Sequence, residues 1–563
     1  MSSFKEKISA LLARLPLWAL AVLGALLLWA AWPVRGFAGL LFINWLPLLL
    51  IEARTAAPDP ATGQYPRFAR WAYLFLVLWN AFTTWWVSLA TIWGGSAAVV
   101  LNAGLMLLPL LAFRRTKRAL GPALGYASLV VYWVAFEQIH LNWDLTWPWL
   151  TLGNGFASTP TWVQWYEYTG QLGGSAWVLT VNVLLFWALR NPPISDAASA
   201  VTTKRRLVAT RFAPAGLTLL LPLLWSAYLL ARFEEKGAAA EVIVVQPNVD
   251  PYNEKFPSNI AFIPYETQIQ RLIQLSDSLL TPQTRFVLWP ETSLEQGADE
   301  VDLPADWRIQ RTRAWLARHP GVQLITGITT LTRYDRPDAS PTVREHNGVY
   351  YDVFNTALHV PGPVAPLAVY HKSKLVPGVE RLPYPSIFGI LKVFAIDLGG
   401  TVGSYGTQPE RGVFAYDASA ANPKVGPVIC YESIYSDFVA GYVRRGATLI
   451  GIITNDGWWA NTPGHRQHLA YAALRAIETR RDVVRAANTG ISAFLDQRGR
   501  ITQTLGWWRR GALRGTVHLN TEQTFYVRHG DYLGYLMPAF ALGLLAMMVV
   551  APRVRRPKAG ATT

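Results

Sequence analysis

The chain has 563 residues, too many for one ordinary domain, and 51% of them are hydrophobic, with 25 Trp and a formal net charge of +15. Its single cysteine excludes an intramolecular disulfide and any zinc or iron–sulfur site built from several cysteines. A basic balance is common in nucleic-acid-binding proteins, but the apolar residues here are concentrated in long runs, so a membrane protein is the first interpretation.

The first 235 residues consist largely of apolar runs, most of them close to the roughly 20 residues that a helix needs to cross a bilayer. We predict seven spans here, at about 15–32, 36–51, 71–93, 96–113, 120–140, 171–189 and 213–232, and an eighth at 533–551. The first run lacks a convincing signal-peptide cleavage site and is followed at once by more spans, so we expect it to remain as a helix. The sequence thus predicts a membrane domain of seven helices over 1–235, a C-terminal transmembrane helix over 530–552 and a basic cytoplasmic tail over 553–563.

The loops between these spans differ in their content of Lys and Arg, which gather on the cytoplasmic side of bacterial membranes. Basic residues are abundant before the first span, after the second, fourth and sixth spans, and after the eighth: Lys5, Lys7, Arg14; Arg54, Arg67, Arg70; Arg114, Arg115, Lys117, Arg118; Arg190, Lys204, Arg205, Arg206, Arg211; Arg553, Arg555, Arg556, Lys558. The intervening loops carry almost none. This alternation predicts that both termini are cytoplasmic and that the segment between the seventh and eighth spans is outside. Much of the positive charge is therefore a topology signal, and we expect no nucleic-acid partner.

The loop at 141–170 is rich in tryptophan and contains Trp147-Pro148-Trp149. Tryptophan is typical of the membrane–water interface, so the composition favours an interfacial aromatic belt. The alternative is a re-entrant or surface segment that shapes an opening toward the lipid.

Residues 240–521 form the predicted soluble domain. Short apolar, β-rich runs lie at 241–246, 286–289, 322–328, 349–358, 367–370, 425–430 and 447–454. Amphipathic stretches at 265–280, 307–318 and 465–481 separate several of these runs. Alternating strands and helices predict a layered α/β or α+β domain.

Three of the apolar runs end in reactive side chains: Glu291 at the first, Lys372 and Lys374 at the second, and Cys430 at the third. Groups just past strand ends tend to converge on one crevice in layered α/β domains. A carboxylate within hydrogen-bond reach can take the proton of a thiol, which is mostly protonated at neutral pH. A Lys ammonium and a backbone N–H can stabilise the oxyanion of acyl transfer, and the ammonium also lowers the pKa of the thiol. Glu, Lys and Cys therefore form a coherent set of base, oxyanion donor and nucleophile.

Each residue also has a purely structural interpretation. Glu291 could cap a helix that starts near Thr292, and Lys372 could be one of several solvated charges. Cys430 could be core packing, which is the common role of a lone cysteine. Three such residues at the ends of β-rich runs in one domain favour the catalytic interpretation.

The Glu, Lys and Cys segments, in this order, resemble the nitrilase (carbon–nitrogen hydrolase) superfamily, and with the surrounding spans the chain resembles the apolipoprotein N-acyltransferase family. The resemblance covers nearly the whole chain and rests on these motifs: Trp147-Pro148-Trp149-Leu150-Thr151-Leu152-Gly153, Trp289-Pro290-Glu291, Phe354-Asn355-Thr356, Lys374-Leu375-Val376-Pro377 with Glu380, Cys430-Tyr431-Glu432, Thr454-Asn455-Asp456-Gly457-Trp458 and Asn488-Thr489-Gly490-Ile491. It implies an αββα sandwich beside the multi-pass α-helical membrane domain.

The resemblance also implies roles for single residues. Glu291 would be the general base, Lys372 the oxyanion stabiliser and Cys430 the nucleophile. Lys372 is preferred to Lys374 because it stands eight residues before Glu380, as the family's Lys does before a second Glu. Supporting or substrate-binding roles fall to Glu380, Tyr431, Glu432, Asn455 and Trp458, and the Tyr431 N–H would be a second oxyanion donor.

Two features depart from the family pattern. Pro377-Gly378-Val379-Glu380 stands where many members have Pro-Phe-Gly-Glu, which leaves the conformation of this loop open. The first loop of the domain carries Lys255-Phe256 and has one extra residue, so Phe256 is not assigned the role of the Trp that the family often has there. His465 and His468 could suggest a metal site, but polar packing at a helix start is favoured, and no metal or other cofactor is expected.

The resemblance implies a bacterial inner-membrane enzyme, acting as a monomer with its catalytic domain in the periplasm, that performs the last step of lipoprotein maturation. An acyl chain would pass from a membrane phospholipid to Cys430 as a thioester, and then to the N-terminal amine of a diacylglyceryl-cysteine apolipoprotein. Two alternatives stay open. A membrane-tethered nitrilase-type amidase or hydrolase would use the same residues with water as acceptor. A non-catalytic lipid-binding or scaffolding membrane protein would not need them.

Overall fold

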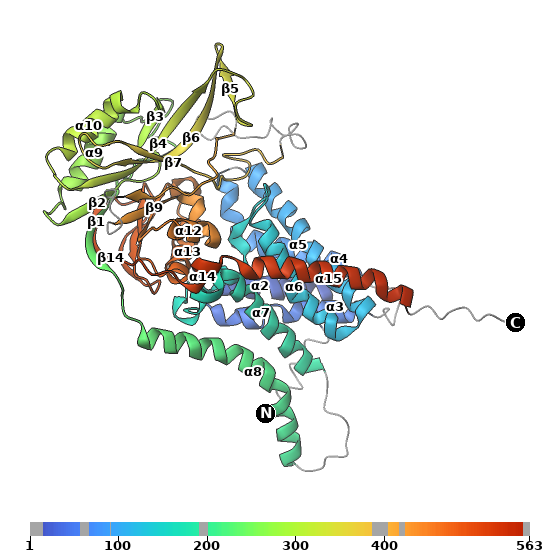
Figure 1. Cartoon of the computed structure of the whole chain (residues 1–563). Helices are drawn as coiled ribbons and strands as arrows, with labels where there is room; N and C mark the ends of the chain where they lie inside the picture. Colours follow the sequence, from blue (N-terminus) through green and yellow to red (C-terminus); the bar gives the residue numbers. More distant parts are fainter. Residues whose placement is uncertain are drawn as a thin grey trace.

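The computed structural model describes residues 15–56, 67–90, 92–190, 201–384, 404–415 and 423–554. Helices from the two ends of the chain lie together, and an α/β region built from the middle of the chain rests against them (Figure 1). Most of the predicted basic tail, from residue 555 on, and the first residues with Lys5, Lys7 and Arg14 lie outside the described residues.

An α-helix overlaps each of the eight predicted spans, the second only in part: α2 (Leu17–Ala31), α3 (Leu46–Arg54), α4 (Phe68–Thr84), α5 (Ile92–Leu120), α6 (Pro122–His140), α7 (Tyr166–Arg190), α8 (Val201–Arg232) and α15 (Tyr532–Val554). Within the described part of the chain, five helical stretches are long and apolar enough to cross a membrane: Phe68–Leu89, Ile92–Leu120, Tyr166–Arg190, Thr210–Arg232 and Tyr532–Val550. The protein is thus a membrane protein. The helices α2, α3 and α6 are shorter or less apolar, so the count of eight spans stays a prediction.

The second predicted span, 36–51, is not one helix. A short 3-10 helix, η1 (Ala38–Phe42), precedes α3, which begins at Leu46 with Pro47 in its first turn. Proline has no N–H to donate to a preceding turn, and its fixed φ suits the start of a helix. Pro47 therefore separates the apolar run into two short helices.

The α/β region contains two sheets. The first has the order β14-β1-β2-β4-β6-β5, with β3 added to β4 and β7 to β6, and the second has the order β13-β12-β11-β10-β9-β8. The first sheet comprises β1 (Ala238–Gln246), β2 (Thr284–Leu288), β3 (Leu294–Asp299), β4 (Gln323–Tyr334), β5 (Arg344–His346), β6 (Val349–Val360), β7 (Ala368–His371) and β14 (Gly511–Leu519). The second comprises β8 (Phe414–Ala415), β9 (Lys424–Ile429), β10 (Leu449–Thr454), β11 (Val483–Ala487), β12 (Ser492–Leu495) and β13 (Ile501–Leu505).

The two sheets pack face to face between two layers of helices. On β1, the alternating side chains Val242 and Val244 join the core shared with the second sheet, whereas Ile243 and Val245 face α9 (Tyr265–Asp277) and α10 (Trp307–Leu316). This two-sided alternation is what a buried strand requires. The second sheet is covered by α12 (Ser436–Arg444) and α13 (Pro463–Thr479). The predicted αββα sandwich is confirmed.

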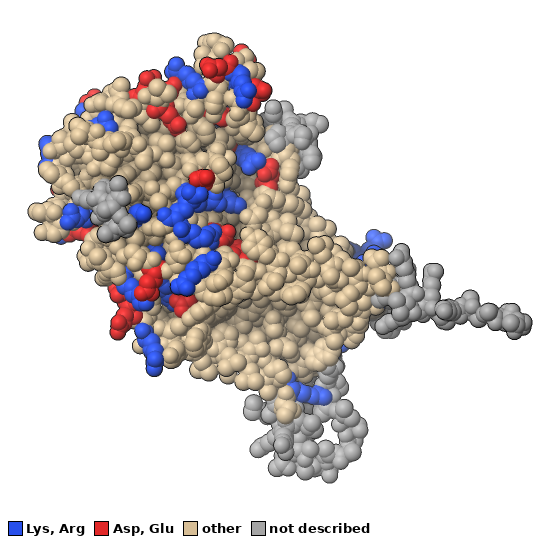
Figure 2. Space-filling view, in the orientation of Figure 1, with Lys and Arg blue, Asp and Glu red and all other residues tan. Residues whose placement is uncertain are grey.

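The helices α12 and α13 lie between the second sheet and the membrane helices, with α7 as their neighbour (Figure 1). One apolar core runs from α2 and α4 through α13 into β9, β10 and β11. The charged side chains visible in Figure 2 gather over the α/β region, while the face over the membrane helices is almost uniformly uncharged. The sandwich is therefore seated on the membrane helices through a large apolar interface.

The Trp-rich segment between α6 and α7 is buried in that interface. It forms three short 3-10 helices, η3 (Pro148–Leu150), η4 (Leu152–Phe156) and η5 (Pro160–Trp162). Trp149 is 3% exposed, its ring contacts Tyr431 and Tyr471, and its carbonyl accepts a hydrogen bond of 2.8 Å from the Tyr471 hydroxyl. Gly153 approaches the Gln171 carbonyl so closely that a Cβ would lie 1.9 Å from it. The predicted aromatic belt is therefore wrong at Trp149, because this part of the segment packs inside the protein against Tyr431, the neighbour of Cys430.

Candidate active site

The three reactive residues follow three strands of the sandwich. Glu291 comes after β2 and Lys372 directly after β7, both in the first sheet, whereas Cys430 directly follows β9 in the second. The parallel strands β1, β2 and β4 end at one edge of the first sheet, and β9, β10 and β11 end at one edge of the second. Because the sheets pack face to face, these edges meet. All three residues line one cavity of about 850 Å³.

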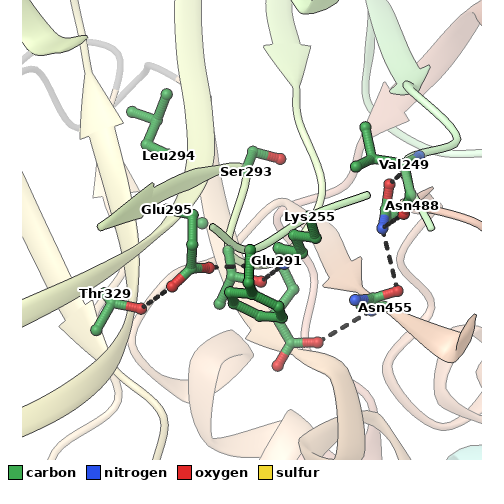
Figure 3. Close-up of polar contacts among 12 residues, drawn as sticks. Val249, Lys255, Glu291, Ser293, Leu294, Glu295, Thr329, Asn455 and Asn488 are labelled. Carbon is green, nitrogen blue, oxygen red and sulfur yellow. Dashed lines mark hydrogen bonds and ion pairs between the residues drawn. The ribbon is translucent and has the colours of Figure 1, made fainter. Parts of the chain in front are cut away.

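Glu291 is held by donors on both carboxylate oxygens. Its Oε1 accepts from Asn355 Nδ2 at 2.8 Å and from Lys372 Nζ at 3.2 Å, and its Oε2 accepts from the backbone N–H of Asn455 at 3.0 Å. Figure 3 shows the Glu291 carboxylate directed at Asn455. Thr292 has a φ of +49°, and the chain turns into β3 instead of a helix, so the helix-capping interpretation of Glu291 is wrong.

Lys372 is buried, at 1% exposure, between two carboxylates. Its Nζ lies 2.7 Å from Glu380 Oε1 and 3.2 Å from Glu291 Oε1. Burial alone would lower the pKa of Lys372, but Glu291 and Glu380 hold that pKa well above its usual value. The ammonium is therefore a fixed positive charge in the cavity and not a solvated one. Lys374 differs, since its Nζ donates to the carbonyl of Leu141 at 2.9 Å.

The loop that carries Glu380 takes a defined conformation despite its altered sequence. Gly378 has a φ of +78°, a conformation that glycine adopts without strain, and its N–H donates to the Arg381 carbonyl at 2.7 Å. Glu380 Oε2 accepts from the Val376 N–H at 2.9 Å. The shifted glycine thus still delivers the Glu380 carboxylate to Lys372.

Cys430 begins η8 (Cys430–Ile434) with a φ of +51°, a conformation that is strained for a residue with a Cβ. The residue is 8% exposed and lines the cavity. Burial and the Glu291 carboxylate raise the pKa of the thiol above its usual range, while the Lys372 ammonium acts in the opposite direction. The resting thiol is therefore protonated and needs a base to become a nucleophile.

The residues next to Cys430 lie behind the cavity. Glu432 is fully buried; its Oε1 accepts from the Ser373 N–H and the Tyr370 hydroxyl, each at 2.7 Å, and its Oε2 accepts from the Ile429 N–H at 2.9 Å. It thus links β7 to β9, and with them Lys372 to Cys430. Tyr431 packs its ring against Trp149 from the membrane region.

Asn455 and Trp458 both line the cavity. The backbone of Asn455 donates to Glu291, and its Oδ1 accepts from Asn488 Nδ2 at 3.3 Å. Trp458 meets the ring of Tyr252 edge to face at 5.2 Å between centroids. Both residues follow the end of β10, which runs parallel to β9, so they lie at the same edge of the sheet as Cys430.

Sequence models of two families match this chain. The carbon–nitrogen hydrolase model matches residues 264–526, and the model of the apolipoprotein N-acyltransferase N-terminal domain matches residues 24–184. The apolipoprotein N-acyltransferase of Chlorobaculum tepidum is 28% identical over 98% of this chain and 99% of its own length. That of Bradyrhizobium diazoefficiens is 31% identical over 66% of this chain and 67% of its own length. The chain belongs to the apolipoprotein N-acyltransferase family.

The predicted family is confirmed, and with it the enzyme class, an acyltransferase. Among solved structures, the α/β region is similar to yeast (Saccharomyces cerevisiae) Nit3, a nitrilase-superfamily member, with 14% identity and a TM-score of 0.35 over 53% of this chain and 96% of that one.

Lys255 is a member of the site that sequence reasoning did not assign. It is 3% exposed, donates to the Thr292 hydroxyl and lies 3.6 Å from the Glu295 carboxylate (Figure 3). Burial lowers its pKa, and Glu295 and Glu291 act against that shift. The sequence feature that could have indicated its role is its position in the loop after the first strand of the domain. Phe256 beside it also lines the cavity.

The two histidines of α13 have different surroundings. His468 Nδ1 lies 2.9 Å from Asp456 Oδ1, and its Nε2 lies 3.0 Å from the Cys430 carbonyl. His465 stacks on Trp507. Within the described ranges, no group of three His, Cys, Asp or Glu side chains is placed to hold a metal ion. His468 instead packs against the strained backbone of Cys430.

Proposed function

We propose that this protein transfers an acyl chain from a membrane phospholipid, through a thioester on Cys430, to the N-terminal amine of diacylglyceryl-cysteine apolipoproteins. Membership of the apolipoprotein N-acyltransferase family supports an apolipoprotein as the acyl acceptor. The observation that carries the catalytic assignment is that Glu291, Lys372 and Cys430 line one cavity, with Lys372 within 3.2 Å of Glu291. Ala90, which ends the helical stretch from α4, lines the same cavity, so the cavity borders the membrane region.

In the first half-reaction, Glu291 accepts the proton of the Cys430 thiol as Sγ attacks the ester carbonyl. The negative charge that develops on the carbonyl oxygen is stabilised by Lys372 Nζ and by the Tyr431 N–H, and each such donor contributes about 3–4 kcal/mol to the transition state. The C–O bond then breaks, Glu291 returns the proton to the leaving glycerol oxygen, and a lysophospholipid departs. Cys430 is left as an S-acyl thioester.

In the second half-reaction, the neutral α-amine of the acceptor attacks the thioester carbonyl. Glu291 accepts a proton from the attacking nitrogen and passes it to the departing Cys430 sulfur, so the enzyme is regenerated and an amide is formed. The acceptor must compete with water, and a cavity that borders the membrane helices favours a lipid-anchored amine over water.

The topology proposal follows from the loop charges. Residues 1–235 form the membrane domain, 240–521 the periplasmic catalytic domain, 530–552 the returning helix and 553–563 the cytoplasmic tail, in the bacterial inner membrane. We propose a monomer, because one chain supplies every residue of the assigned site. Protease added outside spheroplasts is expected to cleave within 240–521, and protection of this domain would overturn the orientation.

The decisive measurement is mass spectrometry of the purified protein incubated with phospholipid alone. We expect an acyl adduct on Cys430 that disappears when a diacylated lipopeptide is added, and no adduct on the Cys430→Ala variant. The amidase alternative predicts the release of fatty acid without lipopeptide acylation. A Cys430→Ala protein that still supports lipoprotein maturation in cells without another such enzyme would exclude the thioester route.

A further inference from the structure

The catalytic cavity has a second polar region, away from the nucleophile, on the face of the first sheet. Alternate residues of β4, β6 and β5 line the cavity: Thr329, Leu331 and Arg333; Asn355, Val353, Tyr351 and Val349; Arg344 and His346. Side chains two apart on a strand share one face, so these residues form a continuous strip. The strip begins at Asn355, which contacts Glu291.

The pairing of the strands arranges this strip in rows. Asn355 pairs with Thr329, Val353 with Leu331, and Tyr351 with both Arg333 and Arg344. The strip therefore runs from a catalytic row through an apolar row to a basic row of Arg333, Tyr351 and Arg344. Tyr351 lies four positions before Asn355 on β6, which corresponds to about 13 Å between Cα atoms in a strand. Since an Arg side chain extends several ångströms from its Cα, a guanidinium of the basic row can cover much of this distance toward the catalytic row.

The two ends of this strip differ in their charged groups. At the catalytic end, the lining carboxylates Glu291, Glu295 and Glu380 lie beside the ammonium groups of Lys255 and Lys372, whereas the basic row brings two guanidinium groups. Arg344 is only partly exposed, and its described contacts include the Ser404 carbonyl at 3.1 Å and the Tyr405 ring. Arg333 is 64% exposed and shares its charge with Asp299 at 2.7 Å. Arg344 is the less exposed of the two and lines the cavity, so it is the stronger candidate for binding an anion there.

We infer that the basic row of Arg333, Tyr351 and Arg344 binds the phosphodiester of the acyl donor, an inference that rests on the proposed phospholipid chemistry. A glycerophospholipid carries its anionic phosphate one glycerol backbone away from the ester carbonyl that Cys430 attacks. The apolar row of Leu331 and Val353 lies under that backbone, and the guanidinium groups offer paired donors that match phosphate oxygens. The row selects a phospholipid over a neutral glyceride with the same acyl chains.

The test compares thioester formation on Cys430 from three donors in mixed micelles: a phosphatidylglycerol, the diacylglycerol with the same acyl chains, and a p-nitrophenyl ester of the same fatty acid. In the wild-type protein we expect phosphatidylglycerol to react faster than diacylglycerol. Arg344→Gln is expected to slow the phosphatidylglycerol reaction about ten- to hundredfold, as the loss of a charged hydrogen bond does, and to leave the p-nitrophenyl ester reaction unchanged. Arg336→Gln is the matched control, because this Arg is 72% exposed and pairs with Asp338 outside the cavity lining.

Several outcomes would overturn the inference. An Arg344→Gln protein that keeps the preference for phosphatidylglycerol would exclude the row as a phosphate site. Equal loss with all three donors, in Arg344→Gln and in the second variant Arg333→Gln, would mean a structural role. Loss confined to transfer from a preformed thioester to the lipopeptide would assign the row to the acceptor. Inhibition of the p-nitrophenyl ester reaction by inorganic phosphate would indicate a free-anion site. The absence of any thioester in the wild-type protein would instead contradict the proposed function.

Discussion

The two walls of the cavity that Glu291, Lys372 and Cys430 line are built in different ways. The wall from the second sheet carries Cys430 and rests on a polar network of Asp456, His468 and Arg485 whose side chains are fully buried. The wall from the first sheet carries Glu380 on a loop and Arg333 on a hairpin, both reached by solvent. The wall that carries Cys430 is therefore buried, whereas the outer part of the first-sheet wall, beyond the buried Glu291 and Lys372, is open to solvent.

The largest effect is expected where the two walls exchange a proton. Glu291→Gln keeps the shape of the side chain but cannot accept the thiol proton, so thioester formation should fall by about 10²- to 10⁴-fold. The measurement is the rate of acyl adduct formation on Cys430 by mass spectrometry. The thermal unfolding of the variant should resemble that of the wild type, and an unchanged acylation rate at neutral pH would remove Glu291 from the role of base.

Substitutions in the buried wall should lower the stability of the fold. Burial would raise the pKa of Asp456, but Arg485 at 2.8 Å and His468 at 2.9 Å hold that pKa well below its usual value. Asp456→Asn removes the negative charge and leaves the Arg485 guanidinium buried without its counter-charge, which costs about 3–5 kcal/mol. We expect a clear fall in the Tm in detergent.

A matched control for this variant is Asp338→Asn, whose ion pair with Arg336 is largely exposed and should leave the Tm unchanged. If Asp456→Asn unfolds at the wild-type temperature while acylation is lost, the network of Asp456, His468 and Arg485 contributes to catalysis and not to stability. The buried wall would then not differ from the open wall in the way described above.

The junction between the catalytic region and the membrane helices gives a pH-dependent prediction. Burial lowers the pKa of Lys374 to about 8, where its ammonium contacts the Leu141 carbonyl and the Tyr435 ring. Because the folded pKa lies below the unfolded value, the unfolded chain binds more protons between about pH 8 and pH 10.5, and stability from this group rises over that window. The contribution is at most about 3 kcal/mol.

The measurement is the difference in Tm between the wild type and Lys374→Met at several pH values. The wild type should gain relative to the variant as the pH rises from 7.5 to about 10, and a constant difference would contradict the shifted pKa. Lys424→Met serves as a comparison, because this Lys lies at the start of β9, away from the junction.

The sequence allowed the prediction of the reactive residues at the strand ends of both walls, but not of the outer part of the open wall. Glu291, Lys372 and Cys430 could be named because each stands at the end of an apolar run, and parallel strands bring such ends together. The basic row could not be predicted, because Arg333 and Arg344 come together only through their pairing with Tyr351 in the folded sheet. In the sequence, an alternation of charged and apolar residues is equally typical of a solvated hairpin.

Other differences between prediction and structure also have identifiable physical reasons. The burial of Trp149 depends on Tyr471, which is more than 300 positions away along the chain. Pro47 breaks an apolar run whose hydropathy alone predicted one span. The packing of His468 against Asp456 agrees with the favoured interpretation of the two histidines, although its contact with the Cys430 carbonyl required the fold.

The smallest effect is expected at the outer anchor of the open wall. Arg381, next to Glu380, pairs with Asp144 of the Trp-rich segment at 3.2 Å, and both side chains are partly exposed. Such a pair contributes about 0.2–1 kcal/mol, so Asp144→Asn should change the acylation rate by less than about fivefold, and the effect should shrink further in high salt. A loss as large as that of Glu291→Gln would show that Glu380 reaches Lys372 only when this loop is tied to the membrane region. The open wall would then be as strictly positioned as the buried one, through a single ion pair instead of a core.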